Sequence, residues 1–165
     1  MWDSISPPWQ ATMKLVWEAY CDDCLPIAAV ITDAEGTILA RGRNRIRGKR
    51  TSPQGFRSGN RLAHAEVEAL NNLDYDSVDR HTCILYTATE PCPMCLSAIY
   101  WARLDRLYFA NSRDDAKAIG FDDAHIYEEV GKPVHERVIP TVHMHLPEAA
   151  AVFAEWHDKA DKVEY

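Results

Sequence analysis

The spacing of hydrophobic residues along the chain alternates between helical and strand-like periods. Met13, Val16, Trp17 and Tyr20 recur at helical spacing, so residues 8–20 are expected to form a helix whose apolar stripe packs on the rest of the protein. The same period, with proline near some of the first turns, predicts further helices over 64–73, 91–101, 123–130 and from 147 onwards. Shorter apolar runs lie between these helices.

These short apolar runs, bounded by turn-forming residues, predict the strands. Two of them, at 27–31 and 37–40, flank a turn that contains Gly36, which is the pattern of a β-hairpin. A strand, a helix and a strand follow one another over 82–110, which predicts a βαβ unit. With a further strand expected at 141–146, the pattern predicts a three-layer α/β architecture with about five strands.

Composition supports a single folded domain and excludes several classes of protein. With 165 residues, of which 47% are hydrophobic and 26% charged, the chain can form one domain over residues 1–165 and is unlike a disordered protein. No apolar run approaches the ~18 residues of a membrane span, and the first residues do not resemble a secretion signal. We therefore expect a cytoplasmic protein that does not bind membranes.

The charge is distributed unevenly along the chain. The formal net charge of −7 argues against a general nucleic-acid-coating protein. Residues 41–61 nevertheless contain no acidic residue, and their glycines and prolines predict a long loop. The basic residues of this loop are Arg41, Arg43, Arg45, Arg47, Lys49, Arg50, Arg57 and Arg61. Nucleic-acid binding is thus not expected of the whole molecule but stays open for the loop.

Histidine, glutamate and cysteine gather at two predicted helix starts. His64 and Glu66 open one helix, and Cys92 and Cys95 open another directly after a strand. Cysteines three residues apart share one helical face, and a helix N-terminus lowers the pKa of a thiol. With an imidazole they offer three ligands to a zinc ion and leave the fourth position to water. Glu66 is placed to accept a proton from that water.

A second C-x-x-C pair leaves a non-enzymatic alternative open. Cys21 and Cys24, together with Cys92 and Cys95, could form a structural zinc site of four cysteines. The 67 residues between the pairs far exceed the ~15 to 20 of zinc-ribbon modules, and such a site leaves the H-x-E motif without a role. H-x-E followed by P-C-x-x-C is the signature of zinc-dependent deaminases, which is the interpretation we favour.

With these motifs the sequence resembles the cytidine-deaminase-like superfamily, and within it the bacterial guanine deaminases. The resemblance covers most of the chain and is carried by residues 64–70, 90–95, 98–103, 120–123, 126–128, 132–137, 153–156 and 164–165. It implies a three-layer αβα fold with a mixed sheet and one Zn²⁺ per chain. By this resemblance His64, Cys92 and Cys95 would hold the zinc ion and Glu66 would shuttle protons.

The resemblance also implies roles for residues outside the zinc motifs. Asn44 matches the asparagine that hydrogen-bonds the base, and Asp123 matches an acid that positions the substrate and moves protons. Trp101 matches a pocket aromatic, and Tyr165 a C-terminal residue that closes the site. A homodimer is expected, in which residues 147–165 are exchanged between subunits.

The reaction that the resemblance implies is hydrolytic deamination of a small-molecule nucleobase, with guanine converted to xanthine and ammonia. Two enzymatic alternatives stay open. The basic residues of 41–61 would suit an RNA adenosine deaminase acting on tRNA, and another aminated ring, such as cytosine, a pterin or an aminotriazine, could replace guanine. The sequence does not fix the volume of the pocket.

Overall fold

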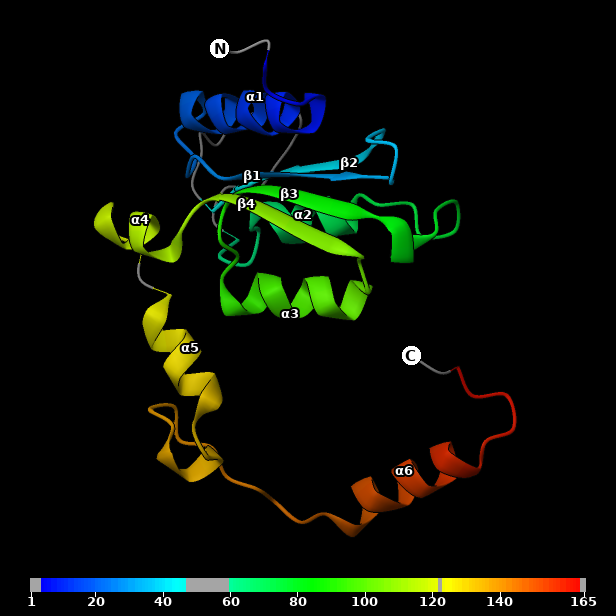
Figure 1. The fold of residues 1–165 in the computed structure, drawn as a ribbon. Coiled ribbons are helices and arrows are strands. Elements are labelled where there is room, and N and C mark those ends of the chain that lie inside the picture. Colours follow the sequence, from blue (N-terminus) through cyan, green and yellow to red (C-terminus); the bar gives the residue numbers. More distant parts are fainter. Residues whose placement is uncertain (1–3, 47–59, 122, 164–165) are drawn as a thin grey trace. The chain divides into compact units, whose positions relative to one another are not determined.

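The protein is built on a four-stranded sheet, seen in a computed structural model (Figure 1). The structure describes residues 4–46, 60–121 and 123–163. The strand order is β2-β1-β3-β4, with antiparallel pairing of β1 to β2 and to β3, and parallel pairing of β3 to β4. The strands are β1 (Ala28–Thr32), β2 (Ile38–Arg43), β3 (Ile84–Thr89) and β4 (Arg106–Asn111). The mixed sheet agrees with the prediction.

Helices cover both faces of this sheet. α1 (Pro7–Cys21) lies on one face, and α2 (Ala65–Asn71) and α3 (Pro93–Ala102) lie on the other (Figure 1). α3 connects the parallel strands β3 and β4, so the predicted βαβ unit is confirmed. The three layers confirm the predicted αβα architecture. None of the helices in the described ranges is long and apolar enough to cross a bilayer.

β2 and α2 approach each other closely at Gly42. A Cβ atom at this position would lie 2.1 Å from the carbonyl oxygen of Ala65 and 2.3 Å from the backbone nitrogen of Ala69. These are backbone atoms, which cannot move aside as a flexible side chain can, so only glycine fits. Gly42 thereby lets α2 pack directly on the edge strand.

α1 packs on the sheet through a different face from the predicted one. Its buried residues are Pro8, Thr12 and Ala19, whereas Trp17 and Tyr20 are 60% and 61% exposed. The two aromatic rings contact each other edge to face on the outer surface, with centroids 5.8 Å apart. Small side chains let the helix approach the sheet closely, and a search for large apolar residues overlooks such a face.

β2 and the segment after β4 both depart from the predicted elements. β2 continues to Arg43, beyond the predicted end at residue 40, so the first residues of the expected loop are paired. α4 (Arg113–Ala118) occupies a stretch where only a polar connection was expected. It begins with a capping box between Ser112 and Asp115, a signal that is visible in the sequence as Ser-x-x-Asp.

The chain divides into two compact units, Met1–Tyr127 and Glu128–Tyr165. The second unit holds the second half of α5 (Ala124–Gly131) and all of α6 (Pro147–Asp158), two helices that agree with the prediction. The strand predicted at 141–146 is wrong, because this extended segment pairs with no strand in the described part of the chain. Alternating side chains favour an extended backbone, but only a neighbouring strand makes it part of a sheet.

Candidate active site

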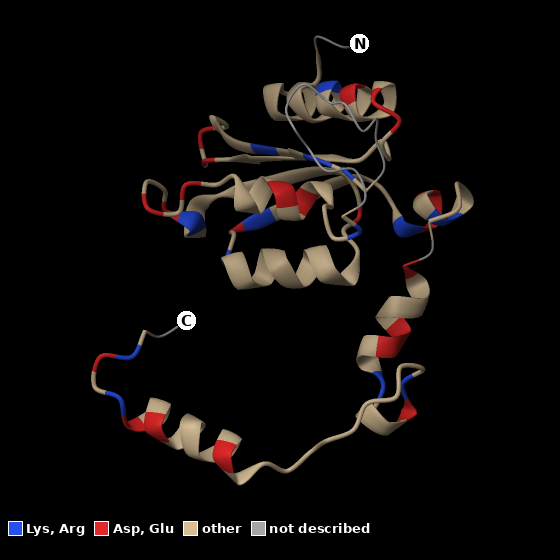
Figure 2. Ribbon diagram, turned by 180° about the vertical axis from the view of Figure 1, so that it is seen from behind, with Lys and Arg blue, Asp and Glu red and all other residues tan. Residues whose placement is uncertain are grey.

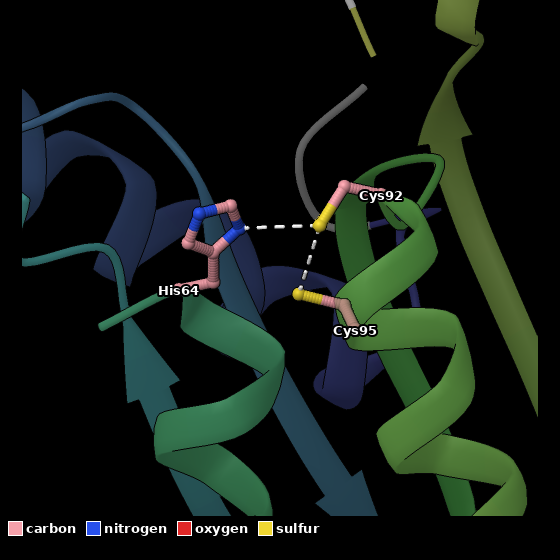
Figure 3. A group of neighbouring side chains, drawn as sticks. All are labelled: His64, Cys92 and Cys95. Atoms are coloured by element: carbon pink, nitrogen blue, oxygen red, sulfur yellow. Dashed lines mark hydrogen bonds between the residues drawn. The ribbon is translucent and has the colours of Figure 1, made fainter. Parts of the chain in front are cut away.

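Three side chains with metal-binding atoms converge between the N-termini of α2 and α3. His64 is the N-cap residue of α2, and Cys92 is the N-cap residue of α3, with Cys95 one turn further along that helix. Nδ1 of His64 lies 3.5 Å from Sγ of Cys92, which lies 3.5 Å from Sγ of Cys95 (Figure 3). The spacing that predicted this cluster is confirmed as a spatial arrangement.

The geometry of this cluster fits a zinc ion. Its three ligand atoms all lie within 4.8 Å of one another. Tetrahedral zinc with Zn–S bonds of about 2.3 Å separates its sulfur ligands by roughly 3.8 Å, which is close to the separation found here. Two thiolates and an imidazole are also ligands that zinc prefers. This donor set supports one Zn²⁺ per chain.

The two thiols of the cluster differ in their affinity for protons. The contact with Cys95 lowers the pKa of Cys92 to about 4, with a further lowering by the hydrogen bond to His64. The same sulfur–sulfur contact raises the pKa of Cys95, as do its burial and the nearby Glu66. The pair therefore shares one proton, which a bound dication would displace.

His64 stands in an anionic environment. Its pKa is raised, chiefly by the hydrogen bond to Cys92, while desolvation acts in the opposite direction. The negative charges of Cys92, Glu66 and Asp123 raise the pKa further. These charges also favour a metal cation at the same position.

Glu66 lies in the first turn of α2, two residues after His64, and is only 3% exposed. Its Oε1 accepts a hydrogen bond of 2.5 Å from the hydroxyl of Thr87 on β3. Burial raises the pKa of Glu66, and the hydrogen bond from Thr87 lowers it in part. A buried carboxyl group with a raised pKa can both accept and return a proton near neutral pH.

Asn44 follows the last residue of β2 and is 1% exposed. Its Oδ1 accepts a hydrogen bond from the backbone of Ile46, whereas its Nδ2 has no hydrogen-bond partner among the described residues. The next residue, Arg45, donates its backbone N–H to the carbonyl oxygen of Ala63, directly before His64. The extension of β2 therefore brings a buried, unused amide donor beside the metal-binding histidine.

Asp123 immediately precedes α5, and its charge contributes to the raised pKa of His64. Trp101 lies near the opposite end of α3 from the cysteines and is 66% exposed. It lies six positions after Cys95, which is about 9 Å along the helix axis. Its role as a pocket aromatic stays a prediction. Tyr165, predicted to close the site, lies outside the described residues.

The second cysteine pair does not join the cluster. In the described part of the chain, the only group of three or more potential metal ligands is His64, Cys92 and Cys95. Cys21 is exposed and Cys24 is half-buried, both as free thiols at the end of α1. The four-cysteine structural zinc site is therefore wrong.

Comparisons with known proteins agree with this geometry. Residues 8–111 match the cytidine and deoxycytidylate deaminase zinc-binding region, and this match contains all three candidate metal ligands and Glu66. The chain belongs to this family. The predicted zinc-dependent deaminase and the predicted fold are thereby confirmed, and the deaminases among the relatives of the chain are hydrolases that act on C–N bonds.

Individual relatives differ in how much of the chain they match. Guanine deaminase of Bacillus subtilis is 41% identical over 85% of each chain, and its crystal structure superposes with a TM-score of 0.81 over 96% of each chain. The structure of guanine deaminase from Nitrosomonas europaea has a TM-score of 0.56 and covers 72% of this chain and 65% of its own. A tRNA-specific adenosine deaminase of Haemophilus influenzae is 32% identical over 60% of this chain and 56% of its own.

Proposed function

We propose that the protein hydrolyses guanine to xanthine and ammonia in the cytoplasm, using one zinc ion held by His64, Cys92 and Cys95. A zinc ion in this position supplies an activated water. In the net reaction one water is consumed, the exocyclic C2–N bond breaks, and the amino group leaves as ammonia. A reducing compartment such as the cytoplasm suits the free thiols of the described residues.

In this reaction Glu66 is the proton carrier. Its carboxylate accepts a proton from the attacking water and gives it to the ring nitrogen of the base. It then accepts the proton of the new C2 hydroxyl group and gives it to the departing amine, as the C2 carbonyl forms. The hydrogen bond from Thr87 fixes the orientation of the carboxyl group, and burial excludes competing water. The raised pKa of Glu66 supports this assignment, because burial favours the protonated form that a proton carrier must pass through.

Asn44 and Asp123 orient the base. The unpartnered Nδ2 of Asn44 donates a hydrogen bond to an acceptor on the ring, which satisfies a buried amide group. The Asp123 carboxylate accepts from ring and amino N–H groups, which guanine carries at N1 and at the C2 amine. Trp101 and Tyr165 complete the pocket in this proposal.

The observation that carries guanine as the substrate is the match to the B. subtilis guanine deaminase structure over 96% of both chains. The zinc motifs are common to the whole family and do not distinguish one base from another. The match extends through the Glu128–Tyr165 unit, beyond the family region that ends at residue 111. Segments outside the zinc motifs are where substrate specificity is determined on a shared fold.

Deamination of adenosine in tRNA is the second candidate, and the basic residues of 41–61 are the observation in its favour. Two of these basic side chains are paired within the protein. Arg43 bonds Asp22 at 2.5 Å, and Arg45 bonds Glu68 at 3.1 Å. Both are therefore poorly placed to contact phosphate, which supports a small base over RNA. Residues 47–59 of the loop lie outside the described part.

We also propose that the protein acts as a homodimer that exchanges residues 147–165. No described residue from 128 to 163 is buried, so this unit has no core of its own. Val152, Phe153 and Trp156 of α6 are 65%, 80% and 50% exposed, which is typical of a face that a partner covers. α3 also carries no charged residue along its length (Figure 2).

The proposed function is tested by ammonia release from a panel of substrates. Guanine, guanosine, adenine, cytosine, a pterin, an aminotriazine and a tRNA containing the target adenosine are incubated with protein whose zinc content is measured on the same sample. We expect ammonia and an equal amount of xanthine from guanine, with much less from the other compounds. Fully zinc-loaded protein that releases no ammonia from guanine would refute the proposal, and inosine in the tRNA would identify the second candidate.

A further inference from the structure

Asp123 lies in the connection that follows β4, and the described residues of this connection form no strand. β4 ends at Asn111, the short helix α4 follows, and Asp123 comes five residues after the last residue of α4. Strand pairing therefore does not determine where the Asp123 carboxylate lies. Other contacts must hold this connection in register with the metal-binding loop.

Tyr127 supplies one of these contacts. Its backbone N–H donates to the carbonyl oxygen of Asp123 at 3.1 Å, which makes Asp123 the start of the first turn of α5. Its hydroxyl donates to the carbonyl oxygen of Pro91 at 2.8 Å. Pro91 is buried and directly precedes Cys92. One side chain thus links the turn that begins at Asp123 to the backbone of the metal-binding loop.

Arg113 and Glu90 complete this link. The guanidinium of Arg113 lies 4.0 Å from the centroid of the Tyr127 ring, and this cation–π contact restricts the movement of the ring. Nη2 of Arg113 donates to Oε1 of Glu90 at 2.6 Å, and its backbone N–H donates to Oε2 at 3.0 Å. Glu90 directly precedes Pro91, so both ends of the link reach the same loop.

We propose that Glu90, Arg113 and Tyr127 form a positioning clasp that holds the Asp123 carboxylate in register with the metal-binding loop for catalysis. These three side chains act through Asp123 and do not touch the substrate. The clasp lies close in the chain to both groups that it connects, because Pro91 adjoins Cys92 and Tyr127 lies in the turn that Asp123 begins. A small displacement of a group that orients a substrate lowers the rate strongly. The inference rests on the role of Asp123 in the proposed function.

The test is a double-mutant cycle between Tyr127 and Asp123. Tyr127→Phe removes only the hydroxyl and keeps the ring under Arg113. We expect kcat/KM for guanine to fall about tenfold, as for the loss of one well-ordered hydrogen bond, while the zinc content and Tm stay close to those of the parent. In the Asp123→Asn background the same substitution should change kcat/KM less than about twofold, because the group that it positions is already disabled.

Tyr75→Phe is the matched control, since Tyr75 is 42% exposed in the connection after α2, and its kcat/KM should equal that of the parent. Arg113→Met should repeat the Tyr127→Phe pattern in both backgrounds. An equal loss of kcat/KM in both backgrounds, or a loss accompanied by loss of zinc, would overturn the clasp. If Asp123→Asn keeps the parent kcat/KM, the clasp and the role of Asp123 are both wrong, while guanine turnover by the parent leaves the proposed substrate intact.

Discussion

Glu66 combines burial with an ionisable side chain, two properties that rarely occur together in one residue. A glutamate that is 3% exposed loses the hydration that stabilises its charge, and hydrogen bonds from Thr87 and Cys95 replace it only in part. A stable fold would place an apolar residue or glutamine here. The proposed reaction instead needs a carboxyl group that gains and loses a proton, which would explain why the site keeps a side chain that is unfavourable for folding.

Glu66→Gln is expected to abolish deamination and to keep the zinc ion. Glutamine has nearly the same shape but cannot carry the proton, and loss of such a carrier costs about 10²- to 10⁴-fold in kcat. Steady-state ammonia release together with zinc analysis measures both effects. Glu18→Gln, on the exposed side of α1, serves as the control and should leave both unchanged. Substantial turnover by Glu66→Gln would contradict the proton-carrier role.

The same substitution should change the stability of the zinc-free protein in a pH-dependent way. Burial raises the pKa of Glu66 above its ordinary value of 4.5. Below pH 4.5 the group is protonated in both states and has no charge to bury. As the pH rises, the unfolded state loses the proton first, so the free energy of unfolding falls. Thermal unfolding of chelator-treated protein should show a higher Tm for Glu66→Gln at neutral pH and a shrinking difference toward pH 4.5.

At the scale of elements, the contact of β2 with α2 determines where the site is assembled. α2 carries His64 at its N-cap and Glu66 in its first turn, and β2 delivers Asn44 from its end. Gly42 sets the distance between the two elements, because backbone atoms of α2 occupy the space of a side chain there. A change at Gly42 therefore acts on packing and on the site together.

Gly42→Ala is expected to destabilise the fold and weaken zinc binding. The new methyl group would overlap the carbonyl of Ala65, and overpacking of this kind costs about 1–3 kcal/mol or more. Denaturant unfolding and zinc titration measure the two effects. Gly131→Ala is the control, since nothing lies within 4 Å of a Cβ built at that residue. Parent-like stability of Gly42→Ala would contradict the close contact of β2 with α2.

Local sequence signals are sufficient to predict several of the helices and strands. The hairpin, the βαβ unit and helices α3 and α6 follow from periodicity and turn residues, and the structure confirms them. α4 was missed although its capping box is a purely local signal. The strand predicted at 141–146 and the buried face of α1 could not be obtained locally, because both depend on which surface lies opposite.

For the whole molecule, the proposed dimer makes a direct prediction. Sedimentation should give about twice the 18.7 kDa of one chain. Phe153→Asp should shift the population toward monomer, because a charge in a covered apolar face is unfavourable. Glu148→Gln, at the polar start of α6, should sediment as the parent does. A monomeric parent at the concentrations used for activity would contradict the homodimer.

The sequence by itself determined the fold class and the zinc chemistry, and it predicted Glu66 as the proton carrier. Cys92 and Cys95 lie three residues apart, and helix geometry places such neighbours on one face without further information, so the sequence could predict a metal-binding pair. Only the tertiary structure decided that Thr87 holds Glu66, that Asn44 keeps a free amide donor, and which contacts hold Asp123. These pairs come from distant segments, and their contacts exist only once the sheet and its helices have packed.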